Sequence, residues 1–272
     1  MTATFGGVEL DRPRIMAIVN VTPDSFSDGG DRFDAARAVE DGLRLASEGA
    51  DFVDVGGEST RPGSQPVPVD EEYRRVVPVV AALAARGVVV SIDTRRAAVA
   101  RGCLDAGARI VNDVSALRDD PELLPLVVER CAAVVLMHRR GLSGDKYSGP
   151  AYRDVVEDVR TFLVERARAA EAAGLSRQKI ALDPGLGFGK STSENVALIA
   201  GAARLASAGY PVLIGASRKS FVGELTGIAE PKNRDPASVR LAVDAARRGA
   251  AIVRVHDVAG TRQALAVARV MG

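Results

Sequence analysis

The sequence contains few of the residues that mark disulfide-stapled or metal-binding proteins. It has no tryptophan, two cysteines and two histidines among 272 residues. Cys103 and Cys131 lie 28 positions apart and match no metal-binding or redox motif. We therefore expect both to behave as small apolar residues in a reducing compartment. The composition excludes a small domain held together by disulfide bonds.

Net charge and long apolar runs are also lacking. Lys and Arg number 36 against 35 Asp and Glu, so a net charge of +1 gives no overall basic field for nucleic acid or acidic membranes. No apolar run approaches the roughly 18 residues of a membrane-spanning helix, and the first residues lack the basic and apolar regions of a signal peptide. We expect a cytoplasmic protein that binds neither nucleic acid nor membrane, so any anion site must be local.

The sequence does contain recurring short apolar runs that are rich in β-branched residues. These runs occupy residues 15–20, 52–57, 88–94, 110–116, 133–139, 180–185, 211–217 and 252–257. Continuous apolarity is typical of parallel strands that are buried on both faces. The stretches between the runs have helical spacing and are rich in Ala, Leu, Arg and Glu. One run follows another every 34 residues or so, about the length of a βα unit.

Eight such units predict an α/β protein with a single (β/α)8 TIM barrel domain over residues 1–272. The first dozen residues would form a short lid across the N-terminal end of the barrel. The alternative is a doubly wound open sheet, which is disfavoured because no GxGxxG motif follows the first run. Two helix starts are also indicated: Ser191 and Glu194 have capping-box spacing, and Asp235 precedes Pro236 as a candidate N-cap.

Polar residues follow the apolar runs, which is where a barrel of this kind places its active site. In chain order they are Asn20, Asp54, Asp93, Asn112, Asp113, His138, Asp183, Ser217, Lys219, Arg254 and His256. Each has an ordinary structural interpretation, because an Asp after a strand is often a helix cap. His138 fits a buried core imidazole and a ligand equally well. The convergence of so many polar groups on one rim favours a polar ligand.

Basic residues after the last two runs predict an anion site. Ser217, Arg218 and Lys219 follow the seventh run, while Arg254 and His256 are two positions apart and point to the same side of the eighth. This corner of a barrel commonly binds phosphate, so a phosphate or pyrophosphate ligand is expected. A Schiff base on Lys219 is the rival interpretation. It is disfavoured because the nearby arginines indicate electrostatics rather than a desolvated amine.

Two connections are longer than a strand-to-helix link requires. Residues 20–30 and 58–70 are rich in Pro, Gly, Ser and Asp, and loops of this kind are often lids over an active site. Phe26 and Arg61 could cover an aromatic or charged substrate. Solvated loop filler is an equally good interpretation, and Asp24 and Asp28 read most simply as cap or turn residues.

Seven motifs at the ends of the runs resemble those of the dihydropteroate synthase family. In order they are IVNVTPDSFSDGG, DVGGESTRPG, SIDT, VNDVS, LDPGLGFGK, GASRKSF and IVRVHDV, within residues 15–258. The resemblance implies that the chain joins 6-hydroxymethyl-7,8-dihydropterin pyrophosphate to p-aminobenzoate. The products would be 7,8-dihydropteroate and pyrophosphate, formed by a dissociative mechanism through a pterin cation. It also implies Mg²⁺ as cofactor and a homodimer as the assembly.

The resemblance assigns roles to particular residues of this chain. The catalytic residues would be Asp93, Lys219, Arg254 and His256. The pterin would contact Asp93, Asn112, Met137, Asp183, Lys219 and Arg254. The p-aminobenzoate pocket and its loops would include Phe26, Thr60, Arg61, Pro62, Gly187, Phe188, Gly215, Ser217 and Lys219. The pyrophosphate would face Asn20, Arg61, Arg254 and His256, with Asn20 also bound to Mg²⁺.

Three other functions are weighed against this one. A methyltetrahydrofolate-binding methyltransferase domain would need neither the anion corner nor the TRPG loop. A non-catalytic pterin-binding paralogue would have lost part of the SRK, RVHD or NVTPDSF motifs, and all are intact. An aldolase or isomerase acting on a phosphorylated sugar would leave Asp93, Asn112 and Asp183 unexplained together. The chain departs from the family pattern at Arg139-Arg140-Gly141, so the role of that loop stays open.

Overall fold

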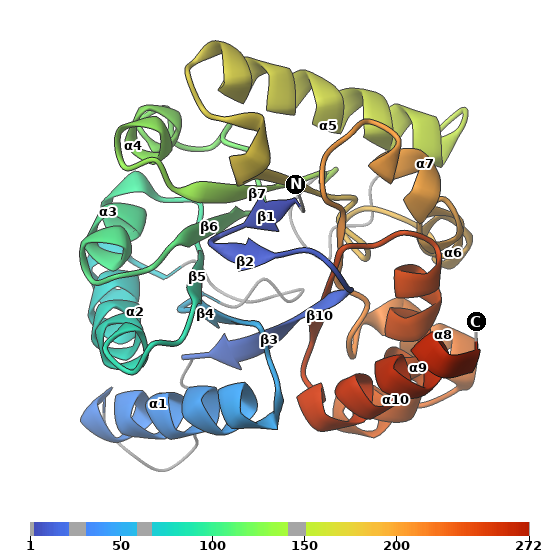
Figure 1. Ribbon diagram of the computed structural model, residues 1–272, viewed down its shortest axis with the longest axis horizontal. Coiled ribbons are helices and arrows are strands. Elements are labelled where there is room, and N and C mark those ends of the chain that lie inside the picture. The colour runs from blue at the N-terminus through green and yellow to red at the C-terminus, as the bar shows by residue number, and fades with distance from the viewer. Residues whose placement is uncertain (1–2, 22–30, 59–66, 141–150, 272) are drawn as a thin grey trace.

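The fold is a closed barrel of parallel strands surrounded by helices (Figure 1). The computed structural model describes residues 3–21, 31–58, 67–140 and 151–271. The barrel strands are β3 (Arg14–Asn20), β4 (Phe52–Gly56), β5 (Val90–Asp93), β6 (Ile110–Asp113), β7 (Ala133–Met137), β8 (Ile180–Asp183), β9 (Leu213–Ile214) and β10 (Ile252–Val255). They pair in the order β8-β7-β6-β5-β4-β3-β10-β9. A parallel bridge between Leu182 and Val212 joins β8 to β9, which confirms the (β/α)8 barrel and excludes an open sheet.

Helices connect the strands around the outside of the barrel. They are α1 (Asp31–Glu48), α2 (Val69–Ala84), α3 (Ala97–Asp105), α4 (Leu123–Glu129), α5 (Val155–Ala172), α6 (Thr192–Ala200), α7 (Ala202–Ala206), α8 (Ser220–Thr226), α9 (Asp235–Arg247) and α10 (Val258–Met271), with 3-10 turns η2 (Arg177–Lys179) and η3 (Pro231–Arg234). The capping box of Ser191 and Glu194 at the start of α6 is confirmed. The N-cap prediction for Asp235 is wrong, because α9 begins at Asp235 itself.

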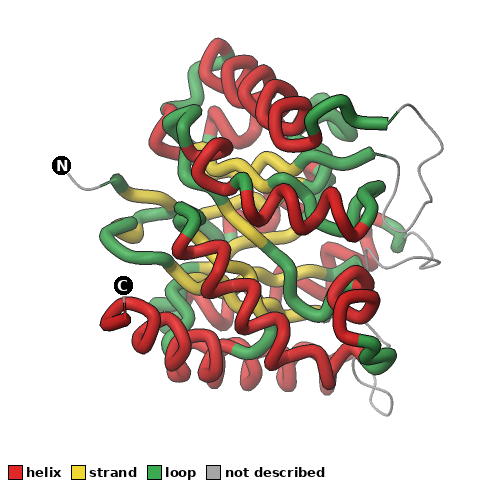
Figure 2. Tube along the Cα trace, turned by 90° about the vertical axis from the view of Figure 1, so that its right-hand side faces the viewer, coloured by secondary structure: helices red, strands yellow, loops and turns green. Residues whose placement is uncertain are grey.

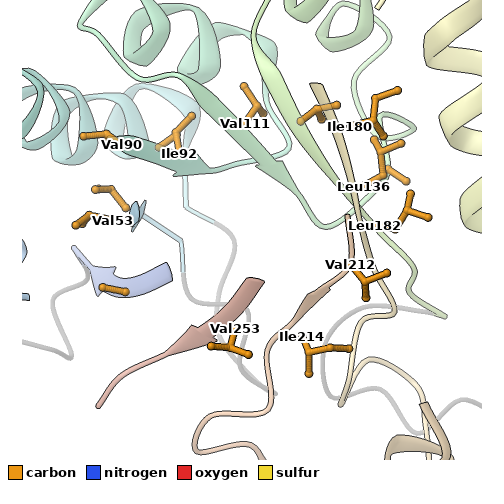
Figure 3. Packing of buried hydrophobic residues seen from close by; sticks show 14 of the residues in the cluster. Val53, Val90, Ile92, Val111, Leu136, Ile180, Leu182, Val212, Ile214 and Val253 are labelled. Carbon is orange, nitrogen blue, oxygen red and sulfur yellow. The ribbon is translucent and has the colours of Figure 1, made fainter. Parts of the chain in front are cut away.

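Alternate residues of each strand face the helices or the barrel interior, as the two-residue period of a strand requires. Figure 3 shows Val53, Ile92 and Val111 of neighbouring strands, which belong to the core between the barrel and its helices. A separate apolar cluster fills the interior. It contains Met16, Phe52, Ile110, Ala133, Val135, Ala181, Leu213 and Ile252, together with Phe5.

The expected N-terminal lid is present. Strands β1 (Thr4–Phe5) and β2 (Val8–Glu9) form an antiparallel hairpin that lies across one end of the barrel (Figures 1 and 2). Phe5 is 1% exposed, and its ring meets the ring of Phe52 edge-on with the centroids 6.2 Å apart. Apolar packing between the hairpin and the barrel interior therefore fills the N-terminal end of the barrel. Among the described residues, no helix combines the length and apolarity that crossing a membrane would require.

Candidate active site

Strand register brings the polar strand ends to one level. Asp93 of β5 lies beside Gly56 of β4 and Asn112 of β6, and Asp183 of β8 lies beside Met137 of β7. Since neighbouring parallel strands end together, these side chains surround the C-terminal mouth of the barrel. The register brings Asp93, Asn112 and Asp183 to the same rim, as predicted from the sequence, and it places Met137 beside Asp183.

Arg254 of β10 lies at the centre of a buried ionic cluster. Its Nε donates to Asp54 Oδ2 at 2.7 Å, and one terminal nitrogen donates to Asp93 Oδ2 at 2.7 Å. Asn112 Nδ2 donates to the same Asp54 oxygen at 2.9 Å. Asp54 is completely buried, and its other oxygen, Oδ1, has no hydrogen-bond partner in the described part of the chain. A single guanidinium is therefore shared by two carboxylates.

The protonation of this cluster reflects its burial. Burial raises the pKa of Asp93 to about 7, against the opposing effect of Arg254 and with a further contribution from the charge of Asp54. Burial also opposes the charge on Arg254, but Asp54 and Asp93 outweigh it and raise the pKa of the guanidinium. Arg254 thus stays a cation, while two acidic side chains compete for it. Asp93 can therefore take either its neutral or its charged form near pH 7, and a ligand that carries or develops positive charge would favour the charged form.

Asp183 and Lys219 are a second pair of charged residues at the mouth, and each shifts the pKa of the other. Asp183 Oδ1 accepts a hydrogen bond of 2.7 Å from the Gly185 amide. Burial raises the pKa of Asp183, whereas the charge of Lys219 lowers it. Burial lowers the pKa of Lys219 to about 8, against the attraction of Asp183. The Lys219 ammonium donates to the Leu186 carbonyl and lies 5.0 Å from the centre of the Phe188 ring.

Two glycines of the predicted site lie against its charged side chains. A Cβ on Gly187 would come 3.3 Å from Lys219 Cδ, and a Cβ on Gly215 would come 3.6 Å from Arg254 Cβ. Phe188 is 7% exposed and covers the same side of the mouth as Lys219. Gly187, Phe188 and Gly215 are therefore brought to the site, as expected from the sequence.

Among the described residues, the anion corner contains fewer basic groups than the sequence indicated. Ser217 Oγ lies 2.9 Å from His256 Nδ1 and accepts a hydrogen bond of 3.2 Å from the His256 amide. These two contacts orient the imidazole through Nδ1. Arg218, in contrast, is bound by both oxygens of Asp235 at 2.7 Å. Its guanidinium is therefore part of the structure around α9, and the basic groups of the corner are Lys219, Arg254 and His256.

Asn20 offers a single neutral oxygen for a metal. A Cβ on Gly56 would lie 3.9 Å from Asn20 Oδ1 and 3.5 Å from Asp93 Cβ, so the Asn20 oxygen lies beside the acidic cluster. The described residues contain no group of three His, Cys, Asp or Glu side chains that could hold a metal ion. A site of this composition suits Mg²⁺, which takes few protein ligands and keeps water and phosphate oxygens.

The structure assigns contacts to two residues near the site, His138 and Lys190, that the sequence did not predict. His138 is a buried core imidazole, because its ring packs edge-on against Phe162 at 4.9 Å and burial lowers its pKa to about 3. Lys190 was not among the predicted residues, yet its ammonium donates to the carbonyls of His138, Gly185 and Phe188. Its position at the end of the LDPGLGFGK motif was the signal available in the sequence.

Part of the predicted site lies outside the described residues. This part comprises Asp24, Phe26 and Asp28 of the first loop and Thr60, Arg61 and Pro62 of the second. The contacts with p-aminobenzoate or pyrophosphate assigned to Phe26, Thr60, Arg61 and Pro62 stay predictions, as does the cap or turn role of Asp24 and Asp28.

The chain belongs to the family of pterin-binding enzymes: the family model described as "Pterin binding enzyme" matches residues 16–256. Relatives that it resembles over nearly their full length include dihydropteroate synthases. The enzyme from Mycobacterium leprae is 48% identical over 260 residues, which cover 93% of this chain and 92% of the relative.

Solved structures of dihydropteroate synthases are also similar to this chain over almost its whole length. Dihydropteroate synthase from Xanthomonas albilineans with 4-aminobenzoic acid is 52% identical, with a TM-score of 0.91, over 97% of this chain and 94% of that one. The same enzyme in complex with 7,8-dihydropteroate is 49% identical, with a TM-score of 0.88, over 97% of this chain and 95% of the other. Similarity over almost the whole chain therefore includes every strand that contributes to the mouth.

Proposed function

We propose that this chain condenses 6-hydroxymethyl-7,8-dihydropterin pyrophosphate with p-aminobenzoate to give 7,8-dihydropteroate and pyrophosphate. The observation that carries the proposal is the buried cluster in which Arg254 is shared by Asp54 and Asp93, facing the Asp183–Lys219 pair. Relatives similar over nearly the full length favour this transferase over a methyltransferase domain or a non-catalytic paralogue.

The pterin fits the hydrogen-bonding groups of the mouth. A pterin presents an amino group and a ring N–H side by side, and a carboxylate accepts such a donor pair in a fork. Asp183 is the acceptor we assign, since Oδ1 is fixed by the Gly185 amide. Asn112 and Asp93 would bind other edges of the ring, Lys219 would donate to its carbonyl oxygen, and Met137 would form an apolar wall.

Charge separation is the chemical problem that the site must solve. Breaking the pterin C–O bond leaves positive charge on the pterin and negative charge on the departing pyrophosphate. Asp93 and Asp183 would stabilise the cation, while Arg254 and His256 would hold the anion. The arylamine then attacks the exocyclic carbon and loses its proton. No side chain needs to form a covalent bond, so Lys219 acts through its charge and hydrogen bonds.

We propose Asn20 as the protein ligand of a Mg²⁺ ion, with pyrophosphate oxygens and water completing its coordination. When bound, the ion would neutralise part of the charge on the leaving pyrophosphate.

The p-aminobenzoate pocket would lie beside Lys219 and be lined by Ser217, Gly215, Gly187 and Phe188. The two loops that carry Phe26 and residues 60–62 would complete it.

A homodimer is proposed on the family resemblance and on exposed apolar side chains. These are Leu225 on α8 and Val267, Val270 and Met271 on α10. Helices α8 and α10 both pack on α9 and lie on one side of the barrel (Figure 1). Light scattering at micromolar concentration should give twice the chain mass, and the monomer mass would contradict the proposal. We also propose a cytoplasmic location, which the family resemblance and the two unpaired cysteines support.

A turnover assay tests the function. The purified protein is mixed with dihydropterin pyrophosphate, labelled p-aminobenzoate and Mg²⁺, with and without EDTA. We expect labelled dihydropteroate to form only when the metal is available. Binding of the pterin substrate without any product would instead indicate the non-catalytic paralogue, and the absence of both would refute a role in pterin chemistry.

A further inference from the structure

Lys190 lies near the end of the loop that joins β8 to α6, just before the N-cap residue Ser191. Its ammonium donates to the carbonyl oxygens of Gly185 at 2.9 Å, Phe188 at 3.2 Å and His138 at 3.3 Å. An ammonium has three N–H donors, so all of them are used. Two acceptors belong to its own loop, and the third belongs to the residue that follows β7.

The loop between β8 and α6 lies directly against the backbone of residues 138–140, which follow β7. Gly185 has a φ of +67°, and a Cβ there would come 1.9 Å from the His138 carbonyl oxygen. Gly189 has a φ of +65°, and a Cβ there would come 2.2 Å from the Arg140 carbonyl oxygen. Close approach of these two segments brings the carbonyl oxygens of His138, Gly185 and Phe188 within reach of one amine. Buried carbonyl oxygens need hydrogen-bond donors, and Lys190 provides them.

Burying this cation is costly. Burial lowers the pKa of Lys190 to about 7; the charges of Asp183 and Glu194 oppose that effect, whereas those of Lys219 and Arg140 add to it. No carboxylate is within hydrogen-bonding distance of the ammonium among the contacts in the described residues. A purely structural cross-link between carbonyls could be made by a neutral donor. The three carbonyl contacts, made to two separate segments, fix the position of the loop relative to the residue after β7.

The loop held by Lys190 carries the groups that define the pterin side of the mouth. The Gly185 amide donates to Asp183, and the Leu186 carbonyl accepts from Lys219. From the helix side, Asn195 Oδ1 accepts 2.8 Å from the Gly187 amide. Lys190 and Asn195 thus both hold the loop through its backbone. A shift of the loop would move the contacts of Asp183 and Lys219 together.

We propose that Lys190 is a positioning residue for the reaction proposed above. Its ammonium fixes the loop between β8 and α6 against the residues after β7, in the shape that lets Asp183 and Lys219 bind the pterin together. The charge of Lys190 also supports the ionised form of Asp183, because each side chain favours the charged state of the other. The residue acts through Asp183 and Lys219 and touches no substrate.

The test compares Lys190→Met, Lys190→Gln and Lys190→Arg with the parent chain. Lys179→Met is the matched control, because the Lys179 ammonium also binds a carbonyl, that of Cys131, but just before β8 at the far end of the barrel. The measurements are the dissociation constant of dihydropterin pyrophosphate by calorimetry without p-aminobenzoate, kcat and KM for both substrates, and Tm.

Loss of a charged donor in a buried site predicts a dissociation constant that rises about tenfold or more for Lys190→Met. We expect Lys190→Gln to be nearly as impaired, Lys190→Arg to recover most of the affinity, and Lys179→Met to match the parent. Lys190→Gln keeps the test valid if the Met variant fails to fold.

Two results would overturn the inference. One is a Met or Gln variant with a lower Tm but pterin affinity and kcat within twofold of the parent, since Lys190 would then only hold the fold. The other is failure of Lys190→Arg to recover affinity while it folds normally. A parent chain that binds pterin without turnover would refute the proposed function instead, and the binding comparison would still decide the role of Lys190.

Discussion

Asp54 links Arg254 to Asn112, so removing its charge tests the organisation of the whole site. We consider Asp54→Asn, which keeps the shape of the side chain. Asp54 Oδ2 accepts 2.7 Å from Arg254 Nε and 2.9 Å from Asn112 Nδ2, and the residue is completely buried. In the variant one oxygen can still accept, but the charge is gone and an amide donor occupies a position without a partner.

The expected loss follows from these contacts. Hydrogen bonds to charged groups are worth about 1.5–3 kcal/mol, and a buried donor without a partner adds to the cost. A protein of this size loses about 2–4 °C of Tm per kcal/mol, so Tm should fall by several degrees. Because Arg254 would keep a charged partner only in Asp93, kcat/KM for the pterin substrate should fall about tenfold or more.

The assay pairs thermal unfolding with steady-state kinetics on the folded protein. Asp244→Asn is the control, because it also removes a carboxylate bound to an arginine, but the Arg240–Asp244 pair on α9 is exposed and should be worth under 1 kcal/mol. Parent-like kcat/KM with a reduced Tm would show that Asp54 only stabilises the barrel. Unchanged values of both would refute the account of the cluster.

Three further predictions concern the same mouth. Asp183→Ala should abolish pterin binding in calorimetry, and an unchanged affinity would refute its assignment as the acceptor of the pterin donors. Arg254→Ala should lower turnover by about a hundredfold or more while leaving a folded protein; a collapsed Tm with normal turnover per folded molecule would contradict that role. Burial lowers the pKa of Lys219 to about 8, and the protonated amine is the form that binds, so kcat/KM should fall as pH rises through 8. Lys219→Arg should move that loss to higher pH. A parent kcat/KM that stays constant up to pH 10 would contradict the prediction that Lys219 must be protonated to bind the substrate.

The barrel and the location of the site were predictable because both depend on local patterns. Continuous apolar runs specify buried parallel strands, and a polar residue directly after such a run has to emerge at the C-terminal rim. Asp93, Asn112 and Asp183 could be assigned to the mouth on this basis, and their convergence is confirmed.

Pairing among those residues was not predictable, because it depends on how the barrel closes. Arg254 and Asp54 are 200 positions apart, and no local signal indicates which carboxylate a guanidinium will meet. Arg218 shows the same limit: the sequence grouped it with the anion corner, whereas α9 brings Asp235 to its guanidinium. The contacts of Lys190 were not predictable for another reason. Its hydrogen bonds within the described residues go to backbone carbonyls, and every residue has a carbonyl, so the sequence does not indicate which ones a lysine will bind.

The central claim is that the carboxylates of the mouth stabilise a pterin cation before the arylamine attacks. Oxygen isotope exchange tests it directly. The pterin substrate is labelled with ¹⁸O at the bridging oxygen and incubated with the protein and Mg²⁺ in the absence of p-aminobenzoate. If the C–O bond breaks first, the pyrophosphate can rotate and rejoin, so label should move from the bridging to the non-bridging positions of recovered substrate. Label that stays at the bridge, in protein that turns over normally once p-aminobenzoate is added, would contradict the cation and favour direct displacement by the amine.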